Sequence, residues 1–373
     1  MESKIIIAIA VAAVVVFGVV AAAVVLMSGG EGGSVKYITL APKDMKANLA
    51  SGQIDAYIAW EPFVSDSVVG DVGEVLMWSD EIMDDHPCCV VAVRTGFLSE
   101  TSVNGTDLTN RFVRAHVDAT EWMLDALADQ AGTNYTKLVE MAVQFTGRNE
   151  SVVKAAFVHI QYGYEMGGDF EEALEKFTDM YIDTNMTTDQ KLDERGYDSI
   201  SNFVSSYVDD SYLATAPTVA ESASILNPDR PIKLGYLLGD LHQLAQVVAQ
   251  NETLLGIGKS MFEKYGVLVE AAVGAPFANG GAEMGGFAAG TVDIGYLGAP
   301  PALLQHLNSG IGTKIVAQAN SEGSGIVVGA DSGITSLSDL ENKTVATPGE
   351  SSIQFLLLKI ALEREGLDLE IKT

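Results

Sequence analysis

The stretch GQIDAYIAWEPF (residues 52–63) decides the fold, because GTVDIGYLGAPP (residues 290–301) repeats its pattern far along the chain. In both places an amphipathic segment typical of a helix ends at a glycine, and a run typical of a buried strand follows. A strand also precedes each helix, and loops this short favour a crossover between parallel strands. The predicted strands are 35–40, 54–60, 267–274 and 292–298, and the predicted helices are 43–52 and 280–290. The sequence therefore predicts two similar α/β lobes.

A second pair of segments has the same design. Residues 232–250 and residues 343–366 each give a buried strand, a glycine-containing loop and a helix. The helices start near 239–242 and 349–354, where unpaired N–H groups leave a partial positive charge. Ligands of open parallel sheets bind beyond the carboxyl ends of the strands, so both loops are candidate binding sites.

The middle of the chain has a different texture. Apolar residues spaced three and four apart predict long amphipathic helices that pack on a sheet. A segment rich in Pro, Ser and Ala at 215–231 has no such period and is typical of a linker. The helices are expected at 107–130, 135–147, 151–166 and 170–184.

Charge and cysteine content exclude some functions. The formal net charge of -28 repels phosphate backbones, so nucleic acid is not an expected partner. The two cysteines, Cys88 and Cys89, are adjacent and are expected to be partly buried free thiols in a strand, able at most to form a strained vicinal disulfide. With five scattered histidines and no further cysteine, no structural zinc site and no cofactor are predicted.

The N-terminus predicts a location outside the cytoplasm. The unbroken apolar run from residue 5 to residue 27 is long enough to span a bilayer as a helix. Lys4 and the amino terminus carry the flanking positive charge, which places residues 28–373 on the outer side. A cleaved signal peptide with small residues at 21–23 is the alternative. Both interpretations export the body of the protein.

Three segments together resemble a known family: DIGYLGAPPALLQ (293–305), SGIVVGADSGITSLSDLENKTVATPGESSIQFLLLKIALE (324–363) and LAPKDMKANLASGQIDAYIAWEPF (40–63). They resemble the nitrate/sulfonate/taurine class of ABC-transporter substrate-binding proteins over nearly all of residues 35–373. The resemblance implies a two-lobed type II periplasmic-binding fold, in which each lobe is a mostly parallel sheet flanked by helices and a cleft lies between them. It also implies a small-molecule ligand and the permease subunits of an ABC transporter as partners.

The order of the segments differs from that family. Family members resemble residues 232–373 first and 35–215 second, so this chain resembles a circular permutation in which the linker joins the usual termini. We therefore expect Val35 and Thr373 to lie near each other, although an exchange of halves between two chains is an alternative. The expected parts are an anchor and spacer (1–33), lobe two (34–92 plus 327–373) and lobe one (93–326), with hinge segments at 88–93 and 324–331.

By motif position, fifteen residues are expected to line the cleft. Ser351 and Ser352 suit an oxyanion, or serve only as helix caps. Trp60 either covers a ligand face or belongs to the core, and Glu61 either accepts hydrogen bonds from a ligand or pairs with Arg94. His242 is either a ligand-binding residue or a surface residue at a helix start. The full set is Trp60, Glu61, Pro62, Leu238, Gly239, Asp240, His242, Gly298, Ala299, Pro300, Gly349, Glu350, Ser351, Ser352 and Gln354.

These features predict the solute-binding component of an ABC uptake system. Serines at a helix start suggest a small oxyanion, and the nearby Asp240, Glu61 and Glu350 suggest a zwitterion such as an aliphatic, taurine-like sulfonate. A thiamine-pyrimidine precursor binding protein or a related enzyme is one alternative, and a ligand-sensing ectodomain is another. No nucleophile, base or metal constellation emerges from the sequence, so no enzyme is predicted.

Overall fold

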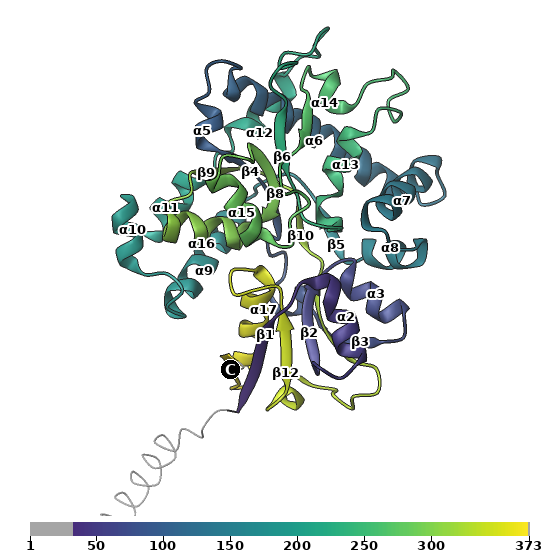
Figure 1. Ribbon diagram of the computed structural model, residues 1–373, viewed down its shortest axis with the longest axis vertical. Coiled ribbons are helices and arrows are strands. Elements are labelled where there is room, and N and C mark those ends of the chain that lie inside the picture. The colour runs from purple at the N-terminus through teal and green to yellow at the C-terminus, as the bar shows by residue number, and fades with distance from the viewer. Residues whose placement is uncertain (1–32, 372–373) are drawn as a thin grey trace, which may run out of the picture.

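The computed structural model of the protein describes residues 33–371 and divides them into two lobes, each built around its own sheet (Figure 1). This is the α/β, two-lobed architecture expected from the sequence. We keep the name lobe two for the part with the six-stranded sheet and lobe one for the part with the five-stranded sheet. A small two-stranded sheet of β5 (Ile160–Tyr162) and β10 (Asn320–Glu322) accompanies them.

In lobe two, strands from both ends of the chain form one sheet. Strand β1 pairs in parallel with β12 on one side and with β13 on the other, and β2 pairs in parallel with β12. Strand β11 runs antiparallel between β2 and β3. In spatial order the strands are β13 (Asp368–Ile371), β1 (Ser34–Thr39), β12 (Thr344–Thr347), β2 (Ala56–Trp60), β11 (Ser324–Gly329) and β3 (Gly73–Trp78). The helices are α2 (Pro42–Ala50), α3 (Phe63–Val69), α4 (Ser79–Ile82), η3 (Leu337–Leu340) and α17 (Ile353–Glu363).

The sheet of lobe one has the same plan. Its parallel strands include one antiparallel member, β4, which lies between β8 and β9. The order is β7 (Val269–Ala271), β6 (Ile232–Gly235), β8 (Ile294–Gly298), β4 (Cys89–Arg94) and β9 (Thr313–Gln318). The helices next to it in sequence are η2 (Leu241–Gln243), α13 (Leu244–Gln250), α14 (Met261–Lys264), α15 (Gly280–Ala288) and α16 (Ala299–Ser309).

The two repeated stretches occupy equivalent places in these sheets. Gly52 and Gly290 close α2 and α15 in the left-handed conformation, with φ of 70° and 69°. The buried run that follows becomes β2 in lobe two and β8 in lobe one. Strand β2 pairs in parallel with β12, and β8 pairs in parallel with β6. The repeat in the sequence is therefore a repeat of one βαβ turn in two lobes.

Long helices of lobe one complete the core, as their apolar spacing predicted. Phe112, His116 and Tyr296 are fully buried where α6 covers the sheet. The predicted helix 151–166 is wrong in its second half, because α8 ends at Phe157 and the chain turns into β5, which pairs with β10. The helices are α5 (Thr95–Leu98), α6 (Gly105–Ala128), α7 (Thr133–Thr146), α8 (Glu150–Phe157), α9 (Phe170–Asp183), α10 (Asp189–Arg195), α11 (Ile200–Tyr207), α12 (Ser211–Thr215) and η1 (Ala216–Thr218).

The predicted linker lies along lobe one. After η1 the chain has no regular element until β6, in agreement with its lack of period. Asn227 is buried, and its side chain donates to the carbonyl of Leu268 (2.9 Å) and accepts from the Leu268 N–H (2.8 Å). Arg230 reaches Asp293 in front of β8 (2.6 Å). These contacts fix the linker to the lobe surface.

The crossings between the lobes lie beside the predicted hinges, not within them. Residues 88–93 and 324–331 were expected to cross, but β4 belongs wholly to lobe one and β11 to lobe two. Ladder hydrogen bonds fix both strands inside their sheets, so the chain changes lobe just before each of them. One crossing passes through Glu322 and Gly323, which have positive φ of 59° and 79°.

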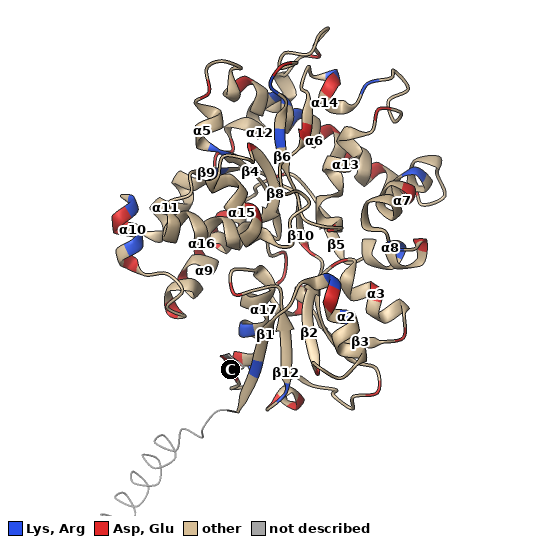
Figure 2. Ribbon diagram, viewed as in Figure 1, with Lys and Arg blue, Asp and Glu red and all other residues tan. Residues whose placement is uncertain are grey.

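Two predictions concern the ends of the chain. The anchor at residues 5–27 falls outside the described residues, and so does Thr373; within residues 33–371 no helix is both long and apolar enough to cross a membrane. Val35 lies opposite Leu369 in the parallel β1–β13 ladder. In the view of Figure 2, Asp and Glu occur along the chain in both lobes.

Candidate functional site

A narrow cavity lies between the lobes, where the central parallel strands of both sheets end. The space inside it that can hold water-sized molecules is about 30 Å³, and the figure rises to about 390 Å³ only when all gaps between atoms and the open solvent at its mouth are included. The end of β2 and residues following β12 approach from lobe two, and residues following β6 and at the end of β8 approach from lobe one. The lining is Trp60, Cys88, Cys89, Leu237, Asp240, His242, Asn279, Gly280, Gly281, Gly298, Pro301, Pro348, Ser351, Ser352, Ile353 and Gln354.

The structure brings together about half of the residues expected to line the cleft. Those on the cavity wall are Trp60, Asp240, His242, Gly298, Ser351, Ser352 and Gln354. Those elsewhere are Glu61, Pro62, Leu238, Gly239, Ala299, Pro300, Gly349 and Glu350. They differ because each turn directs only some of its residues toward the cavity, while the others are buried in the core or exposed. Leu238, for example, is exposed.

Trp60 ends β2 and presents an unused donor. Its side chain is only 5% exposed and packs edge-on against Phe63, with ring centroids 6.0 Å apart. Its indole nitrogen Nε1 is buried and has no hydrogen-bond partner among the described residues. Because a buried N–H without an acceptor costs free energy, a ligand acceptor in the cavity would stabilise this arrangement.

Glu61 points away from the cavity, so neither interpretation given to it holds. Its carboxylate accepts from the Ser65 N–H (2.9 Å) and the Ser65 hydroxyl (2.6 Å) at the start of α3. Burial raises the pKa of Glu61 to about 7, although the hydrogen bonds from Ser65 act in the opposite direction. Its expected partner Arg94 instead pairs with Asp293 (2.7 Å).

Of the two serines after β12, one caps a helix and the other lines the cavity without a hydrogen bond from its hydroxyl to another described residue. Ser352 caps α17, since its hydroxyl accepts from the Phe355 N–H (3.2 Å) and donates to the Gly349 carbonyl (2.6 Å). Ser351 lines the cavity, and its carbonyl accepts from the Tyr181 hydroxyl (2.8 Å). Its own hydroxyl makes no hydrogen bond within the described part of the chain, so it is the serine left to meet a ligand.

Lobe one contributes a buried polar cluster. Asp240 begins the turn after β6 and accepts from the His242 N–H (3.0 Å) and from Gln243 Nε2 (3.0 Å). His242 is fully buried, which corrects the alternative of a surface residue at a helix start. Cys88 and Cys89 are free and 2% exposed each, more deeply buried than expected.

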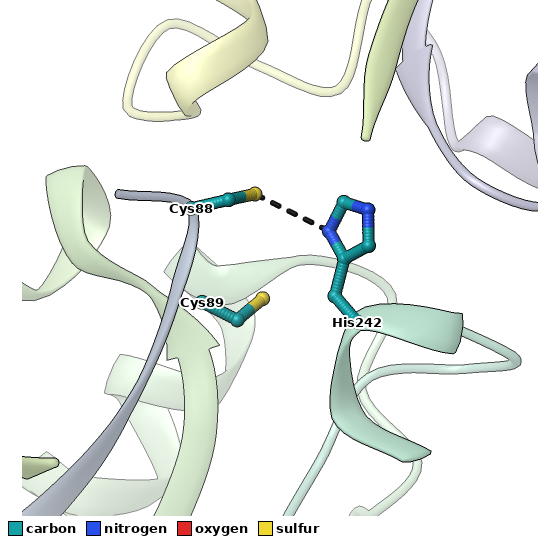
Figure 3. A group of neighbouring side chains, drawn as sticks. All are labelled: Cys88, Cys89 and His242. Carbon is teal, nitrogen blue, oxygen red and sulfur yellow. Dashed lines mark hydrogen bonds between the residues drawn. The ribbon is translucent and has the colours of Figure 1, made fainter. Parts of the chain in front are cut away.

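The cysteines and His242 face one another (Figure 3). Cys88 Sγ lies 3.3 Å from His242 Nδ1, and Cys89 Sγ lies 3.7 Å from Asp240 Oδ2. A hydrogen bond from Cys89 and the neighbouring imidazole hold the pKa of Cys88 well below its usual range. Burial disfavours the charged form of His242, but the charges of Cys88 and Asp240 outweigh it and raise the pKa of His242 to about 9.

Hydrogen bonds join the lobes around the cavity. Asn279 Nδ2 donates to the Pro348 carbonyl (3.3 Å), and the Leu241 N–H donates to the Glu61 carbonyl (3.2 Å). Further out, Arg148 of lobe one pairs with Asp66 of lobe two (2.8 Å). The lobes are therefore in contact across the site, as in the closed form of a hinged protein.

Sequence reasoning missed the cysteines and the start of α15. Cys88 precedes β4 and Cys89 begins it, and nothing in their spacing links them to residue 242. Gly280 and Gly281 were included in the predicted helix 280–290 and Asn279 lies directly before it, but their position beside the cavity depends on how α15 packs on β8. The signal that could have found Asn279 is its place as helix cap, where it accepts from the Ala282 N–H (2.9 Å).

Comparisons with known proteins point to ABC transport. Residues 25–136 match the model of the NMT1-like family, and residues 258–372 match that of the periplasmic phosphonate substrate-binding protein of ABC transporters. Curated relatives named only as binding proteins occur in Brucella abortus (strain 2308), Brucella suis and Brucella melitensis, each 32% identical over 158 residues. That alignment covers 42% of this chain and 43% of the relative, so the chain spans less than half their length. No solved structure matches the chain significantly.

The match over residues 258–372 is to a substrate-binding protein of ABC transporters, and the curated relatives are named as binding proteins. The α/β fold with two lobes agrees with them. The comparisons do not specify the chemistry of a solute.

Proposed function

We propose that the protein is the extracytoplasmic solute-binding component of an ABC uptake system. The observation that carries this proposal is the cavity between the lobes, which is walled by strand ends of both sheets. A solute held there contacts both lobes only when they are closed, so its binding shifts the open–closed equilibrium. The closed protein is the form that permease subunits would recognise.

The solute we propose is a small oxyanion or zwitterion of the aliphatic sulfonate or taurine type. Two residues that line the cavity from lobe two have donors without partners among the described residues, the Trp60 indole N–H and the Ser351 hydroxyl. Both suit acceptor oxygens, and Ser351 lies directly before the capping residue of α17, where helix N–H groups favour negative charge. On the facing lobe, Asp240 suits a cationic amine. A zwitterion satisfies both walls.

Isothermal titration calorimetry on residues 33–373 tests this proposal. The panel contains taurine, ethanesulfonate, nitrate and a thiamine-type aminopyrimidine, and D-glucose serves as a neutral control. We expect taurine to bind more tightly than ethanesulfonate, because only taurine carries an amine for Asp240. If only the aminopyrimidine binds, the solute belongs to the thiamine-precursor class instead. If no sulfonate binds, the proposal of a sulfonate ligand is refuted.

We also propose that the halves of the protein are encoded in permuted order and that residues 5–27 anchor it to the membrane. In lobe one the parallel strands β6, β7, β8 and β9 follow one another along the chain. In lobe two the strand equivalent to β6 is β12, which follows β1, β2 and β3 in sequence, and β1 takes the place equivalent to β7. Reading residues 219–371 before residues 34–218 would give both lobes the same chain order.

A rearranged chain tests the permutation. It would begin at residue 219, run to 371 and continue from 34 to 218. Because β13 and β1 are neighbours, we expect it to fold with the same circular dichroism spectrum and a melting temperature within a few degrees. A rearranged chain that is monomeric but unfolded would contradict the proposal, and a domain-exchanged dimer of the original chain would support the exchange of halves instead.

A further inference from the structure

Three soft ligand atoms converge on one wall of the cavity. They are the Sγ atoms of Cys88 and Cys89 and a ring nitrogen of His242, all within 4.8 Å of one another. All three side chains are buried and line the cavity. Figure 3 shows both thiols turned toward the imidazole, although the cysteines are consecutive in the chain.

The imidazole is held in the orientation that a metal ligand needs. His242 Nε2 lies 3.0 Å from the carbonyl oxygen of Gly323, which can only accept a hydrogen bond. Nε2 therefore carries a proton and Nδ1 faces Cys88 Sγ at 3.3 Å, so that the neutral imidazole has its lone pair on Nδ1. A backbone carbonyl that fixes the far nitrogen is the usual outer partner of a metal-binding histidine.

Gly323 is needed for this support. A Cβ atom at residue 323 would stand 2.3 Å from His242 Nε2, which is closer than atoms approach. The residue also has φ of 79°, a conformation that favours glycine. The crossing between the lobes is thus shaped to hold the imidazole in place.

The spacing fits a small tetrahedral metal ion. Zinc lies about 2.3 Å from sulfur and about 2.0–2.1 Å from imidazole nitrogen, so two ligands of one ion are roughly 3.5–3.8 Å apart. The observed separations need only small side-chain rotations to reach these values. Thiolate and imidazole ligands favour soft or borderline ions such as Zn²⁺ over Mg²⁺ or Ca²⁺.

We propose that Cys88, Cys89 and His242 bind one thiophilic metal ion, with a fourth coordination position open to the cavity. Each thiol loses its proton to solvent as its sulfur bonds the ion, and neutral His242 binds through Nδ1. A sulfonate or carboxylate oxygen held by Trp60 and Ser351 would occupy the open position. This last step rests on the proposed solute function, whereas the metal site stands on the three side chains alone.

No zinc site was predicted from the sequence, because the three ligand residues are far apart in the chain and only the fold brings them together. Metal motifs are recognised by regular spacing, and residues 88, 89 and 242 have none. Strand β4 and the turn after β6 belong to the same sheet, which brings them together. A buried thiol that only donates to His242 Nδ1 is the competing explanation, and it predicts no metal binding.

Cobalt titration of the reduced protein tests the site directly. Because the chain has only two cysteines, any near-ultraviolet sulfur-to-cobalt charge-transfer band must come from Cys88 or Cys89. We expect the band to saturate at one Co²⁺ per chain and to be displaced by Zn²⁺. Cys88→Ser and Cys89→Ser should each reduce the band, and His242→Gln should weaken Co²⁺ binding at least tenfold. His159→Gln, which alters a half-buried histidine outside the cavity, should leave binding unchanged.

A second measurement needs no variant that might fail to fold. Zn²⁺ should protect both thiols of the wild-type protein from a small alkylating reagent, and EDTA should restore their reactivity. Absence of the cobalt band together with unprotected thiols overturns the metal site. Repeating the sulfonate titration with EDTA separates the two proposals. Solute binding without a cobalt band refutes only the metal site, whereas a cobalt band without binding of any solute refutes only the proposed solute function.

Discussion

The strand pairs at the centre of the two lobes begin alike and end differently. In lobe two, Asp55 before β2 accepts from the Thr344 N–H at the start of β12 (2.8 Å). In lobe one, Asp293 before β8 accepts in the same way from the Lys233 N–H in β6 (3.0 Å). The aspartate common to the two repeated stretches thus joins β2 to β12 in lobe two and β8 to β6 in lobe one.

At the opposite ends of these strands the chemistry diverges. Trp60 ends β2 and fills part of the cavity, while the equivalent residue of β8 is Gly298, which leaves space. Lobe two offers an indole N–H and a hydroxyl, and lobe one offers a carboxylate, an imidazole and two thiols. The two lobes therefore share the aspartate contact at one end of these strands, and they differ in the side chains at the end that faces the cavity.

The largest difference between the lobes is expected at the paired aspartates. Asp293 also binds Arg94 (2.7 Å) and Arg230 (2.6 Å), and its side chain is fully buried. Asp293→Asn leaves both arginines facing a neutral group and should lower the free energy of unfolding by about 4 kcal/mol. Asp55→Asn removes one charge-assisted hydrogen bond and should cost only about 1–2 kcal/mol. Urea unfolding measures both, and equal losses would contradict the comparison.

The next effect concerns the carboxyl group between Trp60 and Pro62. Glu61 has a folded pKa of about 7, above its unfolded value of 4.5, so the folded state binds the extra proton. Its contribution to stability is therefore complete below pH 4.5 and is lost as the pH rises to 7, by up to ~3 kcal/mol.

Glu61→Gln should remove this pH dependence. The unfolding free energy of the variant minus that of the wild type should increase from pH 5 to pH 7 and stay level above it. Urea unfolding at four pH values checks this difference. Ala299, the equivalent residue in lobe one, carries no titrating group, so Ala299→Ser is a control that should leave the pH profile unchanged. A Glu61→Gln profile parallel to that of the wild type would show that Glu61 does not titrate in this range.

Trp60→Phe should separate binding from stability. The change keeps an aromatic ring at the end of β2 and removes the indole N–H that lacks a partner. We expect about tenfold weaker binding of the sulfonate that binds best, equivalent to about 1.4 kcal/mol, with unfolding free energy changed by less than that. Calorimetry and urea unfolding of the same sample measure the two. Trp122→Phe, in α6 and not among the residues that line the cavity, is the matched control.

The smallest effect should be the same in both lobes. Gly52 and Gly290 have nearly equal positive φ, and a Cβ at either position would meet no atom within 4 Å. Alanine therefore introduces backbone strain only, and Gly52→Ala and Gly290→Ala should each cost ~1 kcal/mol. Thermal unfolding of both variants checks the equality, and a marked difference would show that the two turns are not equivalent.

The sequence was sufficient for the architecture because local patterns determine it. Glycines that end helices, buried runs of strand length and short loops gave both βαβ units and placed Trp60 and Ser351 at strand ends facing one cavity. Those features depend on residues close together in the chain.

The remaining parts of the site depend on packing between distant segments. Glu61 was placed in the cavity because it follows Trp60, but the turn into α3 directs it to Ser65. The thiols were assigned to an ordinary strand, since only the pairing of β4 with β8 brings them beside the turn after β6. The hinges were misplaced by a few residues because extended segments inside a sheet and between sheets have the same composition.

The indole N–H resonances of the protein test most directly whether the solute binds between the lobes. The chain has three tryptophans, and Trp60→Phe assigns one signal by its disappearance. On titration with the sulfonate that binds in calorimetry, the Trp60 signal should move downfield as its N–H gains an acceptor, while the Trp122 signal stays in place. Saturable binding that leaves the Trp60 signal unchanged would show that the solute is held elsewhere.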